Sequence, residues 1–589
     1  MGTIRYVVFA LVALMFTLYT WLGGGIVAEW LSPWTPWLTL LIAEAALLLP
    51  EQRHGETIFQ ARSRVWRGLL RDPLTWLTLG LSIYLLLQWF NSCTVMQWNP
   101  SKKAWQVLSP AFEWLRHPST AAALANAPAN PSRVDYQFLP ATFAWLPSAL
   151  KSDEAWNVLD WFPPILVALL AMKHATGRRT KRLMLIFVCA MTSVLAIAGI
   201  VQYVVDGTFL YWGRQTGAFF FATFGYPNHA ACFFPAVLLL ALGLALWSLE
   251  YREHTRTFPM LYGAAAALCA LSAVLSESRA GMLFTLAITA FSVLYVPIRY
   301  FGSWTVRSRL LVTVALGAMA VAVLGTAAFR IYAIASNSAR AEAIQEAEKA
   351  LKAAKAPVQA GTEATLEPRP SVEAAEAQLL AARRRPLFGA MPMIDPVLRE
   401  IYETPWADYL EHPMLMRSGY QGILALRQHD AHPWFGTGAW SFRWLNSSYI
   451  DAANPEEREW YQLRKNVGQG NVHNDTLQFL AEHGWIGFGM MLGCVAALFL
   501  PFLAAFLRSP GQTVSDQQAD RCWLNRLNVA GVYIFAATTL IALHSFMDLV
   551  FRSPACMMLY GLLFVCAPGC FLGARKKGME QEPFPATQG

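Results

Sequence analysis

Charged residues are scarce in this sequence. Asp, Glu, Lys and Arg make up 14% of the 589 residues, whereas 55% of the residues are hydrophobic. Apolar runs of about twenty residues recur along the chain, which is typical of a polytopic membrane protein built from helices. These runs are continuous rather than alternating, and this disfavours a transmembrane β-barrel. We therefore expect an all-α polytopic membrane protein.

Several patterns that carry chemistry are also missing. The sequence has no Walker loop, dinucleotide-binding fingerprint, zinc pattern or internal repeat. Its nine cysteines lie mostly in apolar runs and do not form a disulfide framework. His429 and His432, with Asp430 between them, lack the further ligands that a metal site needs. We therefore predict neither a metal ion nor a cofactor.

Twelve segments are predicted to span the membrane. They are residues 4–22, 36–49, 74–90, 161–172, 183–204, 230–249, 258–275, 280–296, 310–329, 484–507, 529–546 and 555–572. Threading these spans places the loops rich in Lys and Arg on one side, which the positive-inside rule identifies as the cytoplasm. Both termini then face the cytoplasm. The formal charge of +8 belongs to these loops and does not indicate a nucleic-acid partner.

The remaining polar segments divide the chain. Residues 1–329 are predicted to hold nine spans, with a non-cytoplasmic loop at about 91–159. Residues 330–472 form a large non-cytoplasmic domain that includes an Ala/Glu-rich helical insertion at about 337–386. Residues 473–574 contain the last three spans, and 575–589 form a cytoplasmic tail.

The stretch GQGNVHNDTLQFLAEHGWIG, residues 468–487, is the centre of the predicted site. Apolar residues at helical spacing predict a helix that opens near Asn474 or Asp475, both of which are good N-caps. His473 then lies beside the positive end of a helix dipole, a position that suits an anion such as a phosphate. A lone histidine in this position can also be a solvated interfacial residue.

Other polar residues stand near the predicted non-cytoplasmic ends of spans. Arg279 lies in a tight turn, where it either snorkels to the interface or has a function. Asn228 follows Arg214 in a turn rich in Gly and Pro, and is either an N-cap or a ligand contact. Arg417 in isolation is an ordinary surface arginine. Glu482 either pairs with a basic neighbour or lines a cavity.

Four of these residues form a set because they face the same predicted side. They are Arg214, Arg279, Arg417 and His473. The planar fork of an arginine binds phosphate oxygens in a bidentate way, and a nearby histidine can remove a proton from a hydroxyl group. The set suits a diphosphate that is held and then released.

The order of four motifs resembles the O-antigen ligase and polymerase superfamily of bacterial membrane glycosyltransferases. The motifs are GAF at 217–219 with PNHA at 227–230, SRAG at 278–281, Arg417 ahead of HPWFGTG at 432–438, and HNDTLQFLAEHGWIG at 473–487. The resemblance covers about residues 183–546, interrupted by the Ala/Glu-rich insertion. It departs from the family pattern at Asn471, where many relatives have His, and at Tyr226, where many have Asn. These departures concern fine substrate specificity more than chemistry.

The resemblance implies an enzyme of the bacterial inner membrane whose active site faces the periplasm. Its donor would be a glycan on undecaprenyl diphosphate, bound by Arg279 and Arg417 without a metal, and His473 would be the base of an inverting transfer. The further residues expected to bind substrate are Arg214, Asn228, Asn474 and Glu482.

The acceptor stays open at this point. It is a lipid A-core sugar for a ligase, the end of another lipid-linked glycan for a polymerase, or a protein Ser or Thr for an O-oligosaccharyltransferase. A different class, a transporter of a lipid-linked anion, would need a polar pathway through the spans. The sequence places few charges there.

Overall fold

The computed structural model describes eleven stretches of the chain and a few isolated positions between 317 and 376. The stretches are residues 6–22, 32–99, 104–108, 136–205, 221–250, 257–276, 278–300, 417–451, 453–455, 470–508 and 527–571. Several predictions therefore lie wholly or largely outside the described residues. They are Arg214, the span at 310–329, the Ala/Glu-rich insertion at 337–386 and the tail at 575–589.

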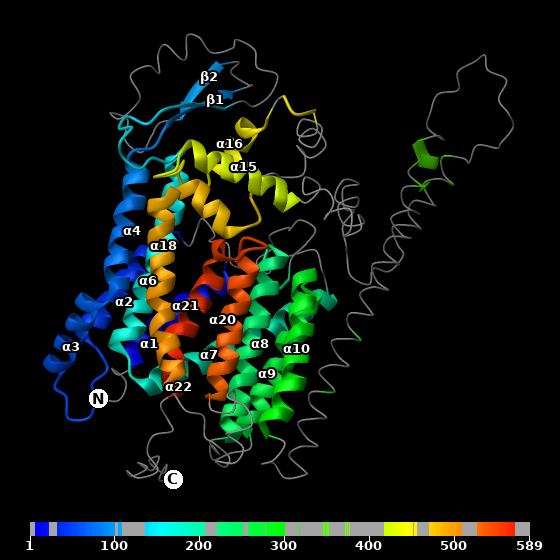
Figure 1. Ribbon diagram of the computed structural model, residues 1–589. Coiled ribbons are helices and arrows are strands. Elements are labelled where there is room, and N and C mark those ends of the chain that lie inside the picture. Colours follow the sequence, from blue (N-terminus) through cyan, green and yellow to red (C-terminus); the bar gives the residue numbers. More distant parts are fainter. Residues whose placement is uncertain are drawn as a thin grey trace.

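Most of the described residues form a bundle of apolar helices (Figure 1). They are α1 (Val7–Trp21), α2 (Thr35–Leu48), α4 (Pro73–Phe90), α6 (Ser152–Ala175), α7 (Arg178–Val205), α8 (Pro227–Glu250), α9 (Thr257–Leu275), α10 (Arg279–Tyr300), α18 (Asp475–Leu507), α20 (Val529–Ser545) and α21 (Pro554–Cys566). Seven helices among the described residues are long and apolar enough to cross a membrane, and α1, α2, α20 and α21 are shorter apolar helices. The expectation of a helical membrane protein is confirmed at this level.

Eleven of the predicted spans coincide with these apolar helices. The exception is the segment at 310–329, which lies outside the described residues. The match follows from composition, because a long apolar segment satisfies its backbone hydrogen bonds internally only as a helix. The helix α6 begins at Ser152 rather than at Trp161, and Pro163 and Pro164 lie inside it.

Helix α8 lies in the core of the bundle, with nearly all of its side chains buried against α9, α20 and α10. Gly243 allows α8 and α20 to approach closely, since a Cβ atom at this position would lie 2.7 Å from the Cβ of Tyr533. The Tyr533 hydroxyl in turn donates a hydrogen bond of 3.2 Å to Ser292 Oγ of α10. This tight core holds the starts of α8 and α10 and the end of α20 in fixed relation.

The predicted loop at 91–159 contains a small sheet, which the sequence did not predict within the otherwise all-α chain. The strands are β1 (Thr94–Asn99), β2 (Ala104–Leu108) and β3 (Tyr136–Leu139), and they pair antiparallel in the order β2-β1-β3. Trp98 pairs with Trp105, and Val95 lies between Leu108 and Phe138. Paired aromatic and β-branched residues stabilise such a sheet, and their alternation is too short to stand out beside the long apolar runs.

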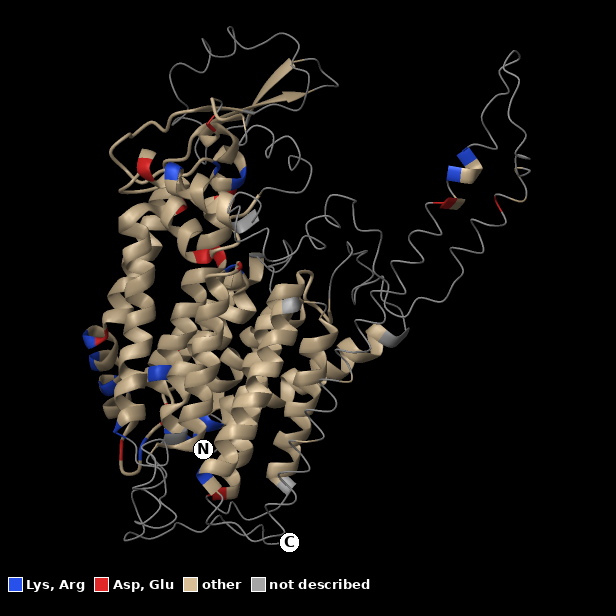
Figure 2. Ribbon diagram, turned by 45° about the vertical axis from the view of Figure 1, so that its right-hand side comes forward, with Lys and Arg blue, Asp and Glu red and all other residues tan. Residues whose placement is uncertain are grey.

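One end of the bundle is covered by the sheet together with α15 (Arg417–Ala431), α16 (Phe442–Leu445) and the short helix η4 (Asn446–Tyr449) (Figure 1). We call this the cap end. At the opposite end α3 (Ile58–Arg71) lies beside the bundle and contacts α2, α4 and α6. Many of the Lys and Arg residues that the structure describes gather toward this opposite end (Figure 2), which we call the basic end.

Candidate functional site

The helix α18 is broken at Gly484, whose backbone has φ 59° and ψ −171°. Such a break frees N–H groups that a continuous helix would satisfy. Here the loop at 432–440 satisfies them, because Trp485 donates to the Pro433 carbonyl at 2.8 Å and Ile486 donates to the Trp434 carbonyl at 3.1 Å. The two motifs HPWFGTG and EHGWIG therefore form one interlocked unit.

Glycine is required on both sides of this interlock. A Cβ atom on Gly436, which has φ 63°, would lie 2.3 Å from the Glu482 carbonyl oxygen, and one on Gly484 would lie 2.5 Å from Trp434 backbone atoms. Gly438 donates its N–H to the Glu482 carbonyl at 2.7 Å. The glycines of these motifs thus fix the cap on α18 and do not themselves indicate a ligand.

A buried ion pair lies just beneath the interlock. Glu482 pairs with Arg552 of the short helix η6 (Val550–Arg552), and both side chains are almost fully buried. The Glu482 carboxylate also accepts hydrogen bonds from Gln478 Nε2 at 2.8 Å and from the Trp440 N–H at 3.0 Å. The Arg552 guanidinium lies over the Trp440 ring at 3.8 Å. The carboxylate is therefore fully engaged by the protein.

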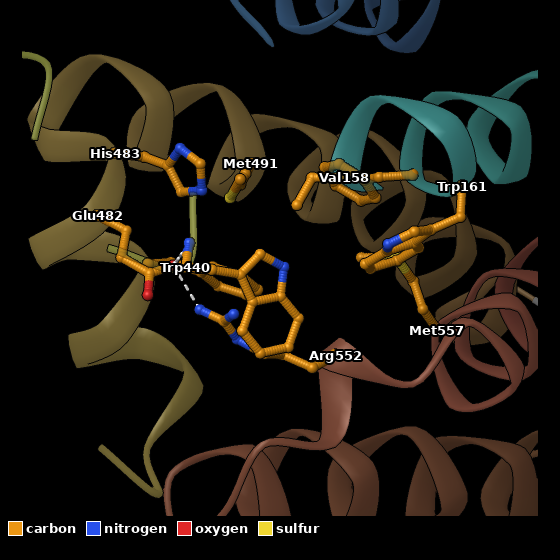
Figure 3. A pocket seen from close by; sticks show the side chains of 10 residues that line it. Val158, Trp161, Trp440, Glu482, His483, Met491, Arg552 and Met557 are labelled. Atoms are coloured by element: carbon orange, nitrogen blue, oxygen red, sulfur yellow. Dashed lines mark hydrogen bonds and ion pairs between the residues drawn. The ribbon is translucent and has the colours of Figure 1, made fainter. Parts of the chain in front are cut away.

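Figure 3 shows this ion pair at the wall of a small cavity. The cavity measures about 10 Å³ and is lined mainly by apolar side chains of α6 and α18 together with Trp440. A space of this size holds about one water molecule. Glu482 both pairs with a basic residue and lines a cavity, but that cavity is too small for a sugar or a phosphate.

His473 lies at the other end of the same helical segment, immediately before the N-cap of α18. Asn474 is that N-cap, since its Oδ1 accepts the Leu477 N–H at 3.0 Å, and its Nδ2 donates to the Phe546 carbonyl at 3.0 Å. The backbone of His473 has φ 54°, a conformation that costs a residue other than glycine about 1–3 kcal/mol. Such strain is concentrated at functional sites. The fold therefore holds this side chain in place at an energetic cost.

The imidazole of His473 meets a carboxylate from a distant part of the chain. Nδ1 of His473 lies 3.1 Å from Oδ1 of Asp548, in the segment between α20 and η6. The Tyr226 hydroxyl donates to the same carboxylate at 2.8 Å, and Asn228 Nδ2 also hydrogen-bonds it. Burial alone would raise the pKa of Asp548, but the hydrogen bond and charge of His473 hold it well below its usual range. The carboxylate is thus ionised.

This contact determines which nitrogen of His473 carries the proton. An ionised carboxylate only accepts hydrogen bonds, so Nδ1 is the donor, and in the neutral imidazole Nε2 then carries the free lone pair. The Nε2 atom is shielded from water and has no hydrogen-bond partner among the residues that the structure describes. A histidine held in this way can accept a proton from a hydroxyl group.

The start of α10 belongs to the same network. Ser278 Oγ donates a hydrogen bond of 2.5 Å to Asn228 Oδ1, and Asn228 bridges to Tyr226 and Asp548. Arg279, the first residue of α10, directly follows Ser278. The structure therefore brings the backbone of Arg279 beside the His473–Asp548 pair, although almost 200 residues separate Arg279 from His473 in sequence.

Arg417 is placed near this group by the packing of α15 against α18. It is the first residue of α15, and Tyr420, one turn later, is buried in a small apolar cluster with Val472 and Phe442. Val472 directly precedes His473. The starts of α8, α10, α15 and α18 thus lie together at the cap end, where the positive ends of helix dipoles favour an anion.

Sequence reasoning found His473 and the helix that follows it, but it missed three partners. They are Asp548, which orients His473; Tyr226, which hydrogen-bonds that carboxylate; and Arg552, which pairs with Glu482. Asp548 had a signal, because it is the only charged residue between 529 and 551. An isolated acid at the end of an apolar span is often functional.

The structure shows the contacts of some of the other predicted residues, and the rest lie outside the described residues. Asn228 is held by Ser278, Tyr226 and Asp548, so its side chain serves the network, and Asn474 caps α18. Whether either also binds a substrate stays a prediction. Arg214 lies outside the described residues. His429 packs edge-on against Trp485 at 5.1 Å, and the described stretches contain no group of three or more His, Cys, Asp or Glu side chains able to hold a metal ion.

The described part of the cap end places His473, oriented by Asp548, beside the starts of several helices. The chain matches no known protein-family model and no curated protein. The resemblance to the O-antigen ligase and polymerase superfamily therefore depends on its motifs, and the function has to be argued from the His473–Asp548 pair and the helix starts around it.

Proposed function

We propose that this protein is a membrane glycosyltransferase that moves a glycan from undecaprenyl diphosphate to an acceptor hydroxyl group. The observation that carries the proposal is the pair formed by His473 and Asp548. The carboxylate holds Nδ1 at 3.1 Å, and Nε2 keeps its lone pair beside four helix starts. A base next to a site suited to anions is what transfer from a diphosphate requires.

The diphosphate would be bound at the starts of α10 and α15. Arg279 and Arg417 are the first residues of these helices, so the proposed diphosphate would meet the positive end of a helix dipole and an arginine together. Each charge-assisted hydrogen bond contributes about 1.5–3 kcal/mol. These contacts would stabilise the negative charge that grows on the leaving diphosphate.

The transfer itself would be a single displacement. The acceptor oxygen attacks the anomeric carbon while His473 Nε2 takes the proton of the hydroxyl group. The bond from the anomeric carbon to the diphosphate oxygen breaks, and the electron pair leaves with the diphosphate. Attack opposite the leaving group inverts the anomeric configuration. Asp548 would stabilise the imidazolium that forms.

The proposed location is the bacterial inner membrane, with the site on the periplasmic face and both termini in the cytoplasm. The gathering of Lys and Arg toward the basic end, away from the His473 network, supports this orientation (Figure 2). The proposed donor enters from the outer leaflet and reaches the cap end from the side of the bundle.

The test is to incubate the purified protein with an undecaprenyl-diphosphate glycan, a chelator and each of three acceptors in turn. The acceptors are lipid A-core, a second lipid-linked glycan, and a protein rich in Ser and Thr. Release of undecaprenyl diphosphate with labelling of one acceptor would support the proposal and distinguish ligase, polymerase and protein glycosylation. Donor binding without release in any of the three reactions would contradict it and favour a transporter.

A further inference from the structure

The basic end contains a groove that the proposed transfer does not use. It measures about 330 Å³, a size at which small ligands bind in proteins. Arg71, Asp72, Lys173 and His174 lie on one side of it, and Ala497 and Leu500 of α18 lie on the other. The groove therefore combines a charged rim with an apolar wall.

The charges of the rim do not cancel. Lys173 Nζ and His174 Nε2 both lie 2.7 Å from Asp72 Oδ2, and Asp72 Oδ1 accepts the Leu74 N–H at 3.1 Å. The carboxylate of Asp72 is thus paired with Lys173 and His174. Arg71 is exposed and forms no hydrogen bond or ion pair with any residue that the structure describes. The rim therefore keeps a net positive charge, which the exposed Arg71 contributes.

The helix that carries Arg71 is amphipathic. Ala61 and Val65 of α3 are buried, and Arg64 donates to the His174 and Glu51 carbonyls at 3.0 and 2.8 Å, which fixes this face to the bundle. Phe59 and Trp66 project outward with 76% and 52% of their surface exposed. A helix with a basic side and exposed aromatic residues lies in the interface of a membrane.

We propose that this groove binds an anionic phospholipid of the leaflet that surrounds the basic end. The phosphate would lie against Arg71, and an acyl chain would run along Ala497 and the exposed side chain of Leu500. A phospholipid matches both parts of the groove, because its head group is negatively charged and its tail is apolar. The lipid would hold α3 and α4 against α18. This inference does not depend on the proposed transferase activity.

The test is native mass spectrometry of the full-length protein in neutral detergent, with phosphatidylglycerol and phosphatidylcholine of identical acyl chains in competition. We expect one tightly bound phosphatidylglycerol, preferred about fivefold over phosphatidylcholine, because one basic residue strengthens binding of an anionic lipid by about this factor. Arg71→Glu should abolish the preference. Leu500→Trp, which fills the groove from an exposed position, should abolish binding of both lipids at this site.

Two control variants distinguish lipid binding in this groove from non-specific attraction of anionic lipids to the basic end. Arg508→Glu reverses an exposed charge at the end of α18 outside the groove, and Leu492→Trp adds the same bulk to an exposed position of that helix. Both should retain the lipid. Equal losses in Arg71→Glu and Arg508→Glu, or equal losses in the two Trp variants, would overturn the proposal. An unmodified protein without any preference for phosphatidylglycerol would overturn it as well.

Discussion

Two side-chain pairs join the start of α18 to the segment after α20, and they differ in which polar atoms have no partner among the described residues. His473 pairs with Asp548, and Glu482 pairs with Arg552 four residues later. In the second pair protein groups satisfy both oxygens of the Glu482 carboxylate. The side chains of Glu482 and Arg552 are 1% and 5% exposed. In the first pair the His473 side chain is 17% exposed, and its Nε2, although shielded from water, forms no hydrogen bond with any described residue.

The difference separates a structural pair from a reactive one. A buried ion pair whose carboxylate is fully hydrogen-bonded fixes the geometry of the segments it joins, and breaking it leaves an uncompensated charge. A pair that orients a histidine but leaves one ring nitrogen free can exchange a proton with a ligand. Glu482 and Arg552 would thus position the segment that carries Asp548, and Asp548 would position His473.

The largest effect is expected for His473→Ala. Loss of the base should lower glycan transfer by about 10²–10⁴-fold, the usual contribution of general base catalysis. Binding of the lipid-linked donor should change little, because the proposed diphosphate contacts come from other residues. The comparison is made by transfer assay and donor binding on protein of verified folding, with His54→Ala as a control at an exposed position. Normal transfer by the His473 variant would disprove its role as the base.

Breaking the second pair should act on stability instead. Arg552→Ala leaves Glu482 buried without its countercharge, and this should lower the free energy of unfolding by about 3–5 kcal/mol. Chemical unfolding in detergent measures the effect, with Arg508→Ala at the exposed end of α18 as a control. The folded fraction should still transfer glycan, so an unchanged stability with lost activity would reverse the assignment of the two pairs.

The interlock between the cap and α18 predicts a smaller loss. Gly484→Ala forces a residue with a Cβ atom into φ 59° and into contact with Trp434 backbone atoms, so it should destabilise the protein by at least about 1–2 kcal/mol. Gly489→Ala is the matched control on the same helix, because a Cβ atom there has nothing within 4 Å. Equal thermal midpoints for the two variants would show that the interlock does not contribute to stability.

The smallest effect is expected for Asp72 at the basic end, as a change in protein stability at acid pH. Burial alone would raise the pKa of Asp72, but the hydrogen bonds from His174 and Lys173 lower it from 3.8 to about 2. A carboxyl group whose pKa is lower in the folded protein than in the unfolded chain stabilises the fold when the pH is above the pKa of the unfolded chain. This stabilisation is lost as the pH falls through the pKa of the folded protein. The unmodified protein should therefore lose more stability than Asp72→Asn between about pH 4 and pH 2. Parallel thermal midpoints across this range would contradict the prediction.

The sequence predicted the parts of the fold that are coded locally. Apolar runs located the helices, and Asn474 marked the start of α18 because a cap and its helix are neighbours in the chain. The sheet was missed because its three short strands lie in a segment that otherwise reads as a loop. The break at Gly484 was also missed, because the carbonyls that satisfy it belong to Pro433 and Trp434, about fifty residues earlier.

The candidate site was predictable only in part for the same reason. His473 stood out through the motif around it. Asp548 stood out only as the single charged residue between 529 and 551, and this does not indicate that it contacts a histidine 75 residues away. Its role follows from the packing of α20 beside α8, which brings Tyr226 and Asn228 to the same carboxylate. Contacts of this range depend on tertiary structure, and a single sequence does not encode them in any local signal.

The most direct test compares Asp548→Asn with Glu482→Gln, two substitutions that each remove one negative charge at almost constant shape. An Asn at 548 can present its amide to Nδ1 and move the ring proton to Nε2, which is the wrong tautomer for a base. We expect Asp548→Asn to lower the turnover number for glycan transfer by at least about a hundredfold with unchanged donor affinity. Glu482→Gln should keep transfer per folded molecule within a few-fold and lose stability. Equal turnover in the two variants, or a greater loss in Glu482→Gln, would contradict the assignment of His473 and Asp548 as the reactive pair.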